Sequence, residues 1–183
     1  MPNNPDVDML IENVMILEGD FSDHPADRGG PTRWGVTEAV ARADGYAGNM
    51  RDFPRKDAAA IYKRKYWVRP GFDRVARLAP DIAAELFDTG INMGPGTAAG
   101  FLQRALNAFN RNGRDYPDIA VDRDIGRRTL AALHAFLRKR GTKGEAVLLK
   151  AIEALQGARY VELSEKRPAN EAFLYGWLAN RIG

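Results

Sequence analysis

The stretch that decides the fold runs from residue 17 to residue 37 and reads LEGDFSDHPADRGGPTRWGVT. Its first residues end an amphipathic helical pattern. The segment from Asp20 to Arg33 is polar and rich in glycine, proline and aspartate, which is typical of a loop or a short hairpin. Thr37 can then cap another short helix. This order predicts a helical domain that carries a small β-tongue near residues 20–36.

The chain on both sides of this stretch is predicted to be almost entirely helical. Upstream, apolar residues recur with i, i+3, i+4, i+7 spacing from Val7 to Leu17, with Asp6 as the N-cap and Gly19 as the end. Downstream, the pattern and its proline and glycine breaks predict helices at residues 37–44, 54–67, 80–91, 95–109, 124–140, 144–166 and 170–181. The expected fold class is therefore mostly α.

Composition excludes several classes of protein. The 183 residues are 45% hydrophobic and 28% charged, which is typical of one globular domain, with or without a small lobe. No apolar run approaches the roughly 20 residues of a membrane span. The absence of cysteine excludes disulfides, thiolate zinc sites and cysteine nucleophiles, and His24 and His134 lie far apart, so a His-rich metal site is not expected. The first residues lack the basic and apolar regions of a standard signal peptide.

Positive charge is concentrated in two segments. The net charge is +3, but residues 51–77 hold nine basic and three acidic residues, and a second cluster lies at residues 138–143. Basic faces attract polyanions such as nucleic acid, an anionic membrane or an acidic wall polymer. Solvated helix faces explain the same clusters equally well.

Glu18 is the most informative candidate for catalysis. It follows Val7, Ile11 and Val14 on one stripe of the first helix, so the spacing predicts that it extends the apolar face. A carboxyl group in an apolar setting holds its proton more strongly, as the general acid in glycosidic cleavage must. The alternative is that Glu18 turns to solvent at the frayed helix end.

Three residues in the following loop complete a candidate site. Asp27 lies nine positions after Glu18, where a solvated carboxylate would stay ionised as a base or electrostatic stabiliser. Thr32 supplies a hydroxyl that could hold a water molecule, and Trp34 a ring that could stack on a sugar. A turn-forming role for Asp27 remains a serious alternative.

Residues 17–37 resemble the signature of glycoside hydrolase family 108, the N-acetylmuramidases of phage endolysins and secretion-linked muramidases. The family pattern is Glu-Gly-Gly-Tyr, a spacer, Asp-x-Gly-Gly-x-Thr and Gly-Ile-Thr, and this chain departs from it at Asp20 and Phe21. The resemblance implies a lysozyme-like fold with Glu18 as the catalytic acid. The order of Glu18, Asp27 and Thr32 is also similar to the catalytic trio of phage-type lysozymes.

The resemblance continues through residues 61–67, 87–96, 101–107 and 122–129. It implies a catalytic region at residues 1–93 and a C-terminal helical, peptidoglycan-binding-like lobe at residues 94–183, packed on it as one compact unit. Tyr66, Trp67, Asp88 and Asn92 are predicted to contact substrate. For Tyr66 and Trp67 core packing is at least as good an alternative, while Asp88 and Asn92 face the same way on one helix.

The implied function is cleavage of the β-1,4 bond between N-acetylmuramic acid and N-acetylglucosamine in peptidoglycan, without a cofactor. The protein would be a monomeric endolysin made in the bacterial cytoplasm and acting on the cell wall after holin-dependent or secretion-system export. Nucleic acid and a membrane span are not expected as partners. The open alternatives are a lytic transglycosylase, a chitinase, a non-catalytic wall-binding or secretion-accessory protein, and a nucleic-acid binder.

Overall fold

The first element of the computed structural model, which describes residues 6–23 and 30–182, is helix α1 (Val7–Glu18). The Asp6 carboxylate caps it by accepting hydrogen bonds from the backbone N–H groups of Asp8 and Met9, at 3.1 and 3.2 Å. Gly19, with φ of +83°, ends it. Both predicted helix ends are confirmed, because each is set by local chemistry that the sequence displays.

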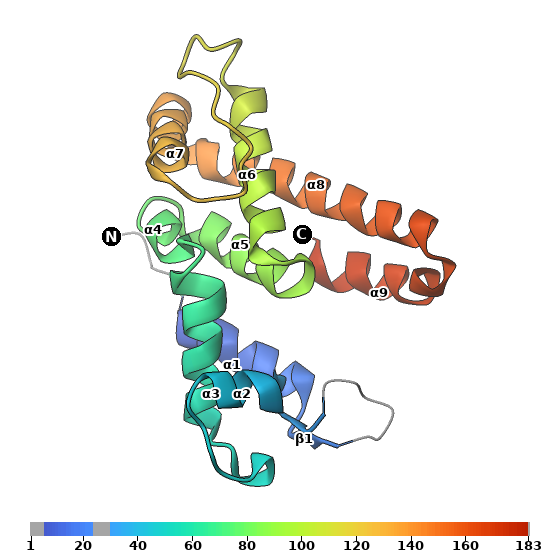
Figure 1. Ribbon diagram of the computed structural model, residues 1–183. Helices are drawn as coiled ribbons and strands as arrows, with labels where there is room; N and C mark the ends of the chain where they lie inside the picture. The colour runs from blue at the N-terminus through green and yellow to red at the C-terminus, as the bar shows by residue number, and fades with distance from the viewer. Residues whose placement is uncertain (1–5, 24–29, 183) are drawn as a thin grey trace. The chain divides into compact units, whose positions relative to one another are not determined.

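The chain divides into two compact units, Asp6–Arg69 and Pro70–Gly183, named here the N-terminal unit and the C-terminal unit (Figure 1). In the N-terminal unit, α1 is followed by a small antiparallel sheet of β1 (Phe21–Ser22), β2 (Thr32–Arg33) and β3 (Val36–Thr37), in that order. The predicted β-tongue is confirmed.

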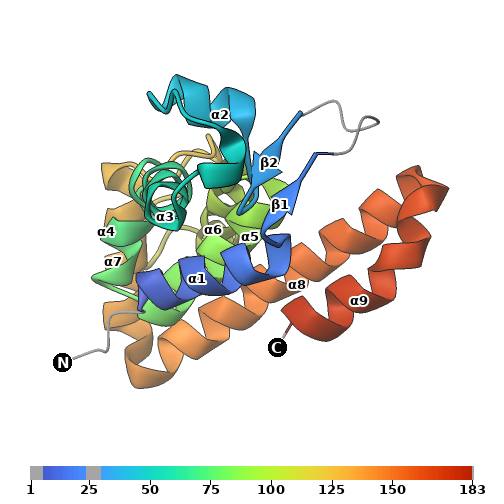
Figure 2. The ribbon, with the colours of Figure 1, turned by 90° about the horizontal axis from the view of Figure 1, so that it is seen from below.

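The turn between β2 and β3 contains two residues with positive φ, Trp34 at +54° and Gly35 at +74°. A tight two-residue hairpin turn needs this left-handed backbone, which glycine adopts freely and tryptophan rarely. Figure 2 shows the sheet beside the end of α1, and the turn brings Gly35 close to Glu18, the last residue of that helix.

Three further elements complete the N-terminal unit. Helix α2 (Glu38–Ala43) is capped by the Thr37 hydroxyl, and a short 3-10 helix spans Met50–Asp52. Helix α3 (Arg55–Tyr62) then continues as a π-helix over Lys63–Val68, where the sequence predicted one uniform helix. Wider π turns often occur at functional sites.

The described residues of the C-terminal unit form helices and loops without a β-strand. Its helices are α4 (Phe72–Ala76), α5 (Pro80–Met93), α6 (Pro95–Phe109), α7 (Arg127–Arg140), α8 (Gly144–Lys166) and α9 (Glu171–Arg181). Helix α8 packs against α5, α6 and α7, and α9 folds back along it (Figures 1 and 2). The predicted helices are confirmed apart from their starts and ends, and α4 is an addition.

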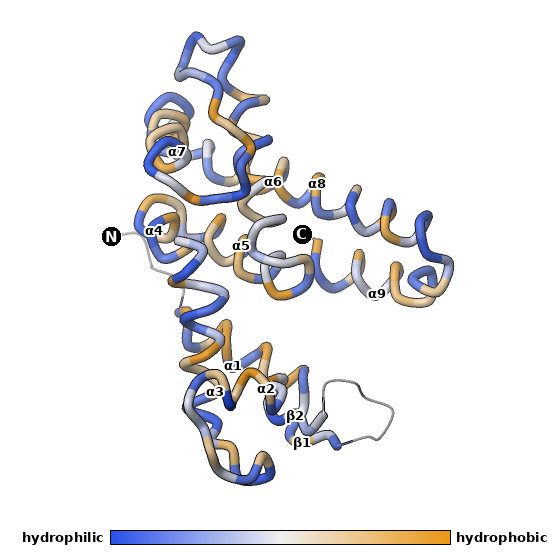
Figure 3. Tube along the Cα trace, in the orientation of Figure 1, coloured by the Kyte–Doolittle hydropathy of each residue, from blue (hydrophilic) through white to orange (hydrophobic). Residues whose placement is uncertain are grey.

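The core of the C-terminal unit is built from aliphatic and aromatic side chains that are at most 2% exposed: Phe72, Ile82, Leu86, Phe87, Leu102, Leu106, Ile125, Leu133, Phe136, Leu148 and Ile152. Figure 3 shows hydrophobic and hydrophilic positions alternating along the helices, as amphipathic helices require. Each large apolar side chain buried in this way stabilises the fold by roughly 1.5–3 kcal/mol. No helix in the described residues is long and apolar enough to cross a membrane.

Candidate active site

Glu18 is the last residue of α1, and its side chain is exposed. The prediction that it extends the buried face is wrong. Ile11 and Met15 are buried, each 1% exposed. The helix ends one turn later, at Glu18, and the core does not cover this last turn. The carboxyl group is consequently open to a ligand from solvent.

Gly35 brings the hairpin turn against Glu18 and Tyr62. A Cβ atom on Gly35 would overlap the Tyr62 hydroxyl and lie 2.9 Å from Glu18 Cγ. Contacts this short are not tolerated between real side chains, so only glycine fits here. The backbone of the turn, the carboxylic side chain and the phenol therefore meet at one place.

Tyr62 is the functional candidate that the sequence analysis missed, because the residue it contacts, Gly35, lies far from it in the sequence. Its side chain is 5% exposed, and burial raises the pKa of its phenol, with the nearby charge of Glu18 and Tyr66 acting in the same direction. The phenol thus keeps its proton through the physiological range. A neutral O–H donor stands beside the Glu18 side chain.

A small pocket of about 120 Å³ opens next to this contact. It is lined by Gly35, Val36, Thr37, Val40, Ile61, Tyr62, Lys65 and Tyr66. Its volume matches a few water molecules or one small substituent of a sugar ring, because a water molecule takes about 30 Å³ of liquid volume. The pocket supplies space for a ligand group, with a cation at its edge in Lys65.

Asp27 lies outside the described residues. Thr32 lies on β2, half-buried, and its hydroxyl donates a hydrogen bond to the Gly30 carbonyl at 3.2 Å. The Thr32 oxygen keeps lone pairs that can accept from a water molecule. Its predicted role beside Asp27 stays a prediction.

Trp34 is fixed by its surroundings. Its indole N–H donates to the Phe53 carbonyl at 3.3 Å. The guanidinium groups of Arg33 and Arg55 lie 5.3 and 4.6 Å from the ring centroid, within the range of cation–π attraction. A sugar that stacks on Trp34, as predicted, would compete with these cations for the ring.

Asp20 and Phe21, the two departures from the family pattern, have structural roles in the same tongue. The Asp20 carboxylate accepts from Arg33 Nε at 3.0 Å, and the Asp20 carbonyl accepts from the Trp34 N–H at 2.9 Å. The Arg51 guanidinium lies 4.3 Å from the centre of the Phe21 ring. Asp20 therefore ties β1 to the hairpin turn that carries Gly35.

Tyr66 and Trp67 lie in the π-helix but in different environments. Tyr66 is half-buried, lines the small pocket and stacks on Tyr62 with ring centres 5.7 Å apart. Trp67 is only 4% exposed. Tyr66 is thus available to a ligand, whereas burial argues against the predicted substrate contact of Trp67.

Asp88 and Asn92 belong to α5 of the C-terminal unit. Asn92 Nδ2 donates to the Asp88 carbonyl at 2.8 Å, so the two residues do share a face, and Arg181 of α9 donates to the Asp88 carboxylate at 2.6 Å. Burial raises the pKa of Asp88, and the Arg181 charge and hydrogen bond oppose that rise. Both side chains are engaged within their own unit, and their predicted contact with substrate stays a prediction.

Metal chemistry has no candidate in the described parts of the chain, where no group of three or more His, Cys, Asp or Glu residues could hold an ion. The arrangement at Glu18 instead combines an accessible carboxyl group, a neutral phenol and a small pocket. Such a set can transfer a proton to a bound oxygen atom.

Comparison with known proteins identifies both parts of the chain. Residues 11–94 match the family described as Glycosyl hydrolase 108, and residues 97–182 match the family described as Predicted Peptidoglycan domain. The chain is also similar to a solved structure titled "Structure of Brucella abortus SagA", with a TM-score of 0.63 and 23% identity, covering 94% of this chain and 87% of that chain. No curated protein sequence matches.

The structural similarity agrees with the mostly helical, lysozyme-like fold expected from the sequence. The Glycosyl hydrolase 108 match begins within α1 and includes the β-tongue, Gly35 and Tyr62. The residues that gather around Glu18 therefore lie in the region that matches Glycosyl hydrolase 108, and this region makes the protein a glycoside hydrolase.

Proposed function

We propose that the protein is a lysozyme-type N-acetylmuramidase that hydrolyses the β-1,4 bond between N-acetylmuramic acid and N-acetylglucosamine in peptidoglycan. The chain combines a glycosidase region with a peptidoglycan domain. Peptidoglycan is the polymer on which both could act. The observation that carries the proposal is the exposed carboxyl group of Glu18, placed beside the Gly35 turn and the Tyr62 phenol.

Glu18 is proposed as the general acid that protonates the leaving glycosidic oxygen. Its exposure lets the carboxyl group reach the bond, and a bound glycan would itself exclude water from the group. The buried Tyr62 hydroxyl and Glu18 Cγ both lie next to Gly35, and the neutral phenol is proposed to limit the positions that the carboxyl group can adopt. Proton transfer by a group held in this way contributes typically 10²–10⁴-fold to rate.

Asp27 and Thr32 are proposed to act on the other side of the scissile bond. The carboxylate would stabilise the oxocarbenium-like charge or activate a water molecule, which Thr32 would orient. The separation of the Glu18 and Asp27 carboxyl groups would decide the stereochemistry, since about 5–5.5 Å favours retention and about 6.5–9.5 Å favours inversion.

The wider biological assignment is part of the same proposal. Residues 1–93 would form the catalytic region and residues 94–183 the peptidoglycan-binding lobe. The protein would act as an endolysin on the bacterial cell wall, reached through a holin or a secretion system. The basic segment at residues 51–77 suits an anionic wall.

The test compares turbidity loss of purified, outer-membrane-stripped cell walls for the wild type and Glu18→Gln. This change keeps the shape of the side chain and removes its titratable proton. Glu12→Gln is the matched control, because it makes the same change six residues earlier on α1 at an exposed residue that pairs with Arg55. We expect Glu18→Gln to lose at least about 100-fold in rate and the control to keep its rate.

Equal clearing by wild type and Glu18→Gln would refute the assignment of the acid. Product masses then separate the two chemistries on this bond. Hydrolysis adds one water to the product, whereas a lytic transglycosylase leaves an anhydro ring that lacks it. Anhydro products would retain Glu18 as the acid and replace hydrolysis by transglycosylation.

A further inference from the structure

A groove of about 580 Å³ lies in the C-terminal unit between α7 and the loop that follows α6. Its lining is Tyr116, Pro117, Asp118 and Ile119 from the loop and Arg128, Ala131, Ala132 and Ala135 from α7. The α7 residues have i, i+3, i+4, i+7 spacing and so form one face of the helix. The volume falls within the roughly 300–1,000 Å³ of small-ligand sites.

The loop wall of the groove is fixed before any ligand arrives. The Tyr116 hydroxyl donates to the Leu106 carbonyl at 2.7 Å. The Asn107 side chain donates to the Ile119 carbonyl at 2.8 Å and accepts from the Ile119 N–H at 2.9 Å. Because these bonds already order the loop, a ligand would not have to supply that ordering free energy.

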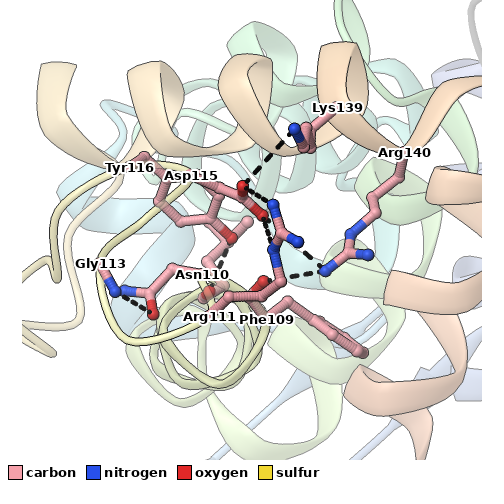
Figure 4. A network of polar contacts seen from close by, with 9 residues as sticks. Phe109, Asn110, Arg111, Gly113, Asp115, Tyr116, Lys139 and Arg140 are labelled. Carbon is pink, nitrogen blue, oxygen red and sulfur yellow. Dashed lines mark hydrogen bonds and ion pairs between the residues drawn. The ribbon is translucent and has the colours of Figure 1, made fainter.

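A charged network ties the start of the same loop to the end of α7 (Figure 4). The Asp115 carboxylate accepts from Arg111 Nε at 2.9 Å and Nη2 at 2.5 Å. Lys139 Nζ and Arg140 Nη2 each lie 3.9 Å from it. The two walls of the groove are thereby held to each other as well as to the core.

The groove has an apolar floor with one charge of each sign. The alanine methyl groups, Pro117 and Ile119 offer aliphatic surface. Arg128 is exposed and has no ion pair or hydrogen bond with any residue that the structure describes. The Asp118 carboxylate uses one oxygen to accept from Asn110 Nδ2 at 2.5 Å, which leaves its other oxygen for a ligand.

This chemistry suits a short peptide better than a glycan. A sugar ring needs several hydrogen-bond partners for its hydroxyl groups, and here the Tyr116 hydroxyl proton is already donated to Leu106. A peptide with methyl side chains, carboxylates and an ammonium group matches the alanine surface, Arg128 and Asp118 in turn.

We propose that this groove binds the peptide stem of peptidoglycan, an alanine-rich acidic peptide. Arg128 would pair with a carboxylate of the stem, and Asp118 would accept from its ammonium group. The inference rests on the proposed function in taking peptidoglycan as the substrate. Every lining residue falls inside the match to the Predicted Peptidoglycan domain. The groove would be the place in that domain where the peptide part of the polymer binds.

The experiment titrates the full chain with two soluble probes and follows its backbone amides by NMR. One probe is the tetrapeptide L-Ala-γ-D-Glu-meso-diaminopimelate-D-Ala, and the other is the N-acetylglucosamine tetramer. We expect the peptide to shift amides within residues 116–135 with a Kd below about 1 mM. Arg128→Gln should weaken this binding about tenfold, whereas Arg127→Gln, a neighbouring exposed arginine outside the groove lining, should leave it unchanged.

Ala131→Leu provides a second variant that fills the groove. Ala131 is exposed, so the larger side chain does not overpack the core, and unchanged thermal unfolding would show that the fold is intact. We expect this variant to lose peptide binding. Glu18→Gln should bind the peptide like the wild type, so loss of hydrolysis and loss of stem binding are separate results.

Three results would overturn the inference. Shifts at the groove caused by the N-acetylglucosamine tetramer alone would make it a glycan site. Shifts that depend on protein concentration without a probe would make it a self-association surface. The absence of any shift at millimolar peptide would show that the groove does not bind the stem.

Discussion

The Tyr62 hydroxyl occupies the space that a Cβ atom on Gly35 would need. This contact joins the turn of the β-tongue to the end of α3, two segments that are separated by 27 positions in the sequence. Since the Glu18 side chain approaches the same point, the position of the proposed acid depends on the absence of a side chain at Gly35.

Gly35→Ala is therefore expected to destabilise the protein and to displace Glu18. The alanine would have to adopt φ of +74° and push the Tyr62 ring aside. Left-handed strain and overpacking together cost about 2–5 kcal/mol. Thermal unfolding measures the loss, and wall clearing below the unfolding temperature should also fall. Gly176→Ala, on α9, is the control that should lose neither stability nor activity, because its added Cβ would meet no atom within 4 Å apart from its chain neighbours and the backbone of its own helix.

Tyr62→Phe removes only the hydroxyl group and tests whether the phenol positions Glu18. We expect kcat to fall about tenfold with KM nearly unchanged, because the lost interaction orients the acid and does not bind the glycan. Steady-state kinetics on a soluble glycan measure the two constants. A rise in KM at constant kcat would instead place Tyr62 in substrate binding, and Tyr175→Phe, 85% exposed on α9, should alter neither constant.

Most helix ends could be predicted from single residues that act locally. Asp6, Thr37, Pro80 and Pro95 each stand at the start of a helix, as their side chains or fixed backbone angles require. Helix α4 was not predicted, since its five residues are too few to show a helical period.

The environment of the site was harder to predict than its residues. Helical periodicity places Glu18 on the same side of the helix as Ile11. It cannot show which turns of the helix other elements cover, and the last turn, with Glu18, is exposed to solvent. Tyr62 was missed because its partner Gly35 is distant in sequence. A glycine in a predicted turn indicates only a flexible backbone, and not that another side chain packs against it. The tertiary contact that gives Gly35 its second role requires the structure.

The raised pKa of Glu85, on α5, should make the folded protein less stable as the pH rises toward 8. Burial raises its pKa to about 7 from an ordinary 4.5, nearby Asp88 and Glu153 act in the same direction, and a hydrogen bond from Thr89 and the charge of Arg181 oppose them. A raised carboxyl pKa means that the folded protein binds the proton more tightly than the unfolded chain. The stability contributed by Glu85 is thus complete below about pH 4.5 and is lost as the pH rises through about 7.

Glu85→Gln keeps an acceptor for Thr89 and removes this titration. We expect the variant to exceed the wild type in free energy of unfolding at pH 8 by about 1–3 kcal/mol and to lose that advantage at pH 4. Urea unfolding at both pH values measures the difference. Glu171→Gln, an exposed change on α9, should follow the wild type, and parallel behaviour of Glu85→Gln and wild type would contradict the prediction.

Asp115, beside the groove, should make the stability of the fold depend on pH in the opposite direction, and Asp115→Asn tests this. Hydrogen bonds from Arg111 hold the pKa of Asp115 below its usual range, and Lys139 and Arg140 add to the effect. A lowered carboxyl pKa stabilises the fold above the unfolded pKa, and that contribution is lost as the pH falls through the folded value. Wild type should therefore be more stable than Asp115→Asn at pH 7, and the gap should close in acid.

The same variant should loosen the loop, because three cations lose their shared anion while Tyr116 and Asn107 still hold the far part of the wall. Amide hydrogen exchange is expected to speed up at residues 111–115 more than at Ile119. High salt should reduce the stability gap, since exposed charges are screened. Glu165→Gln, an exposed carboxylate on α8, is the control. Unchanged exchange in Asp115→Asn would show that the hydrogen bonds of the Tyr116 and Asn107 side chains with backbone groups alone hold this wall of the groove.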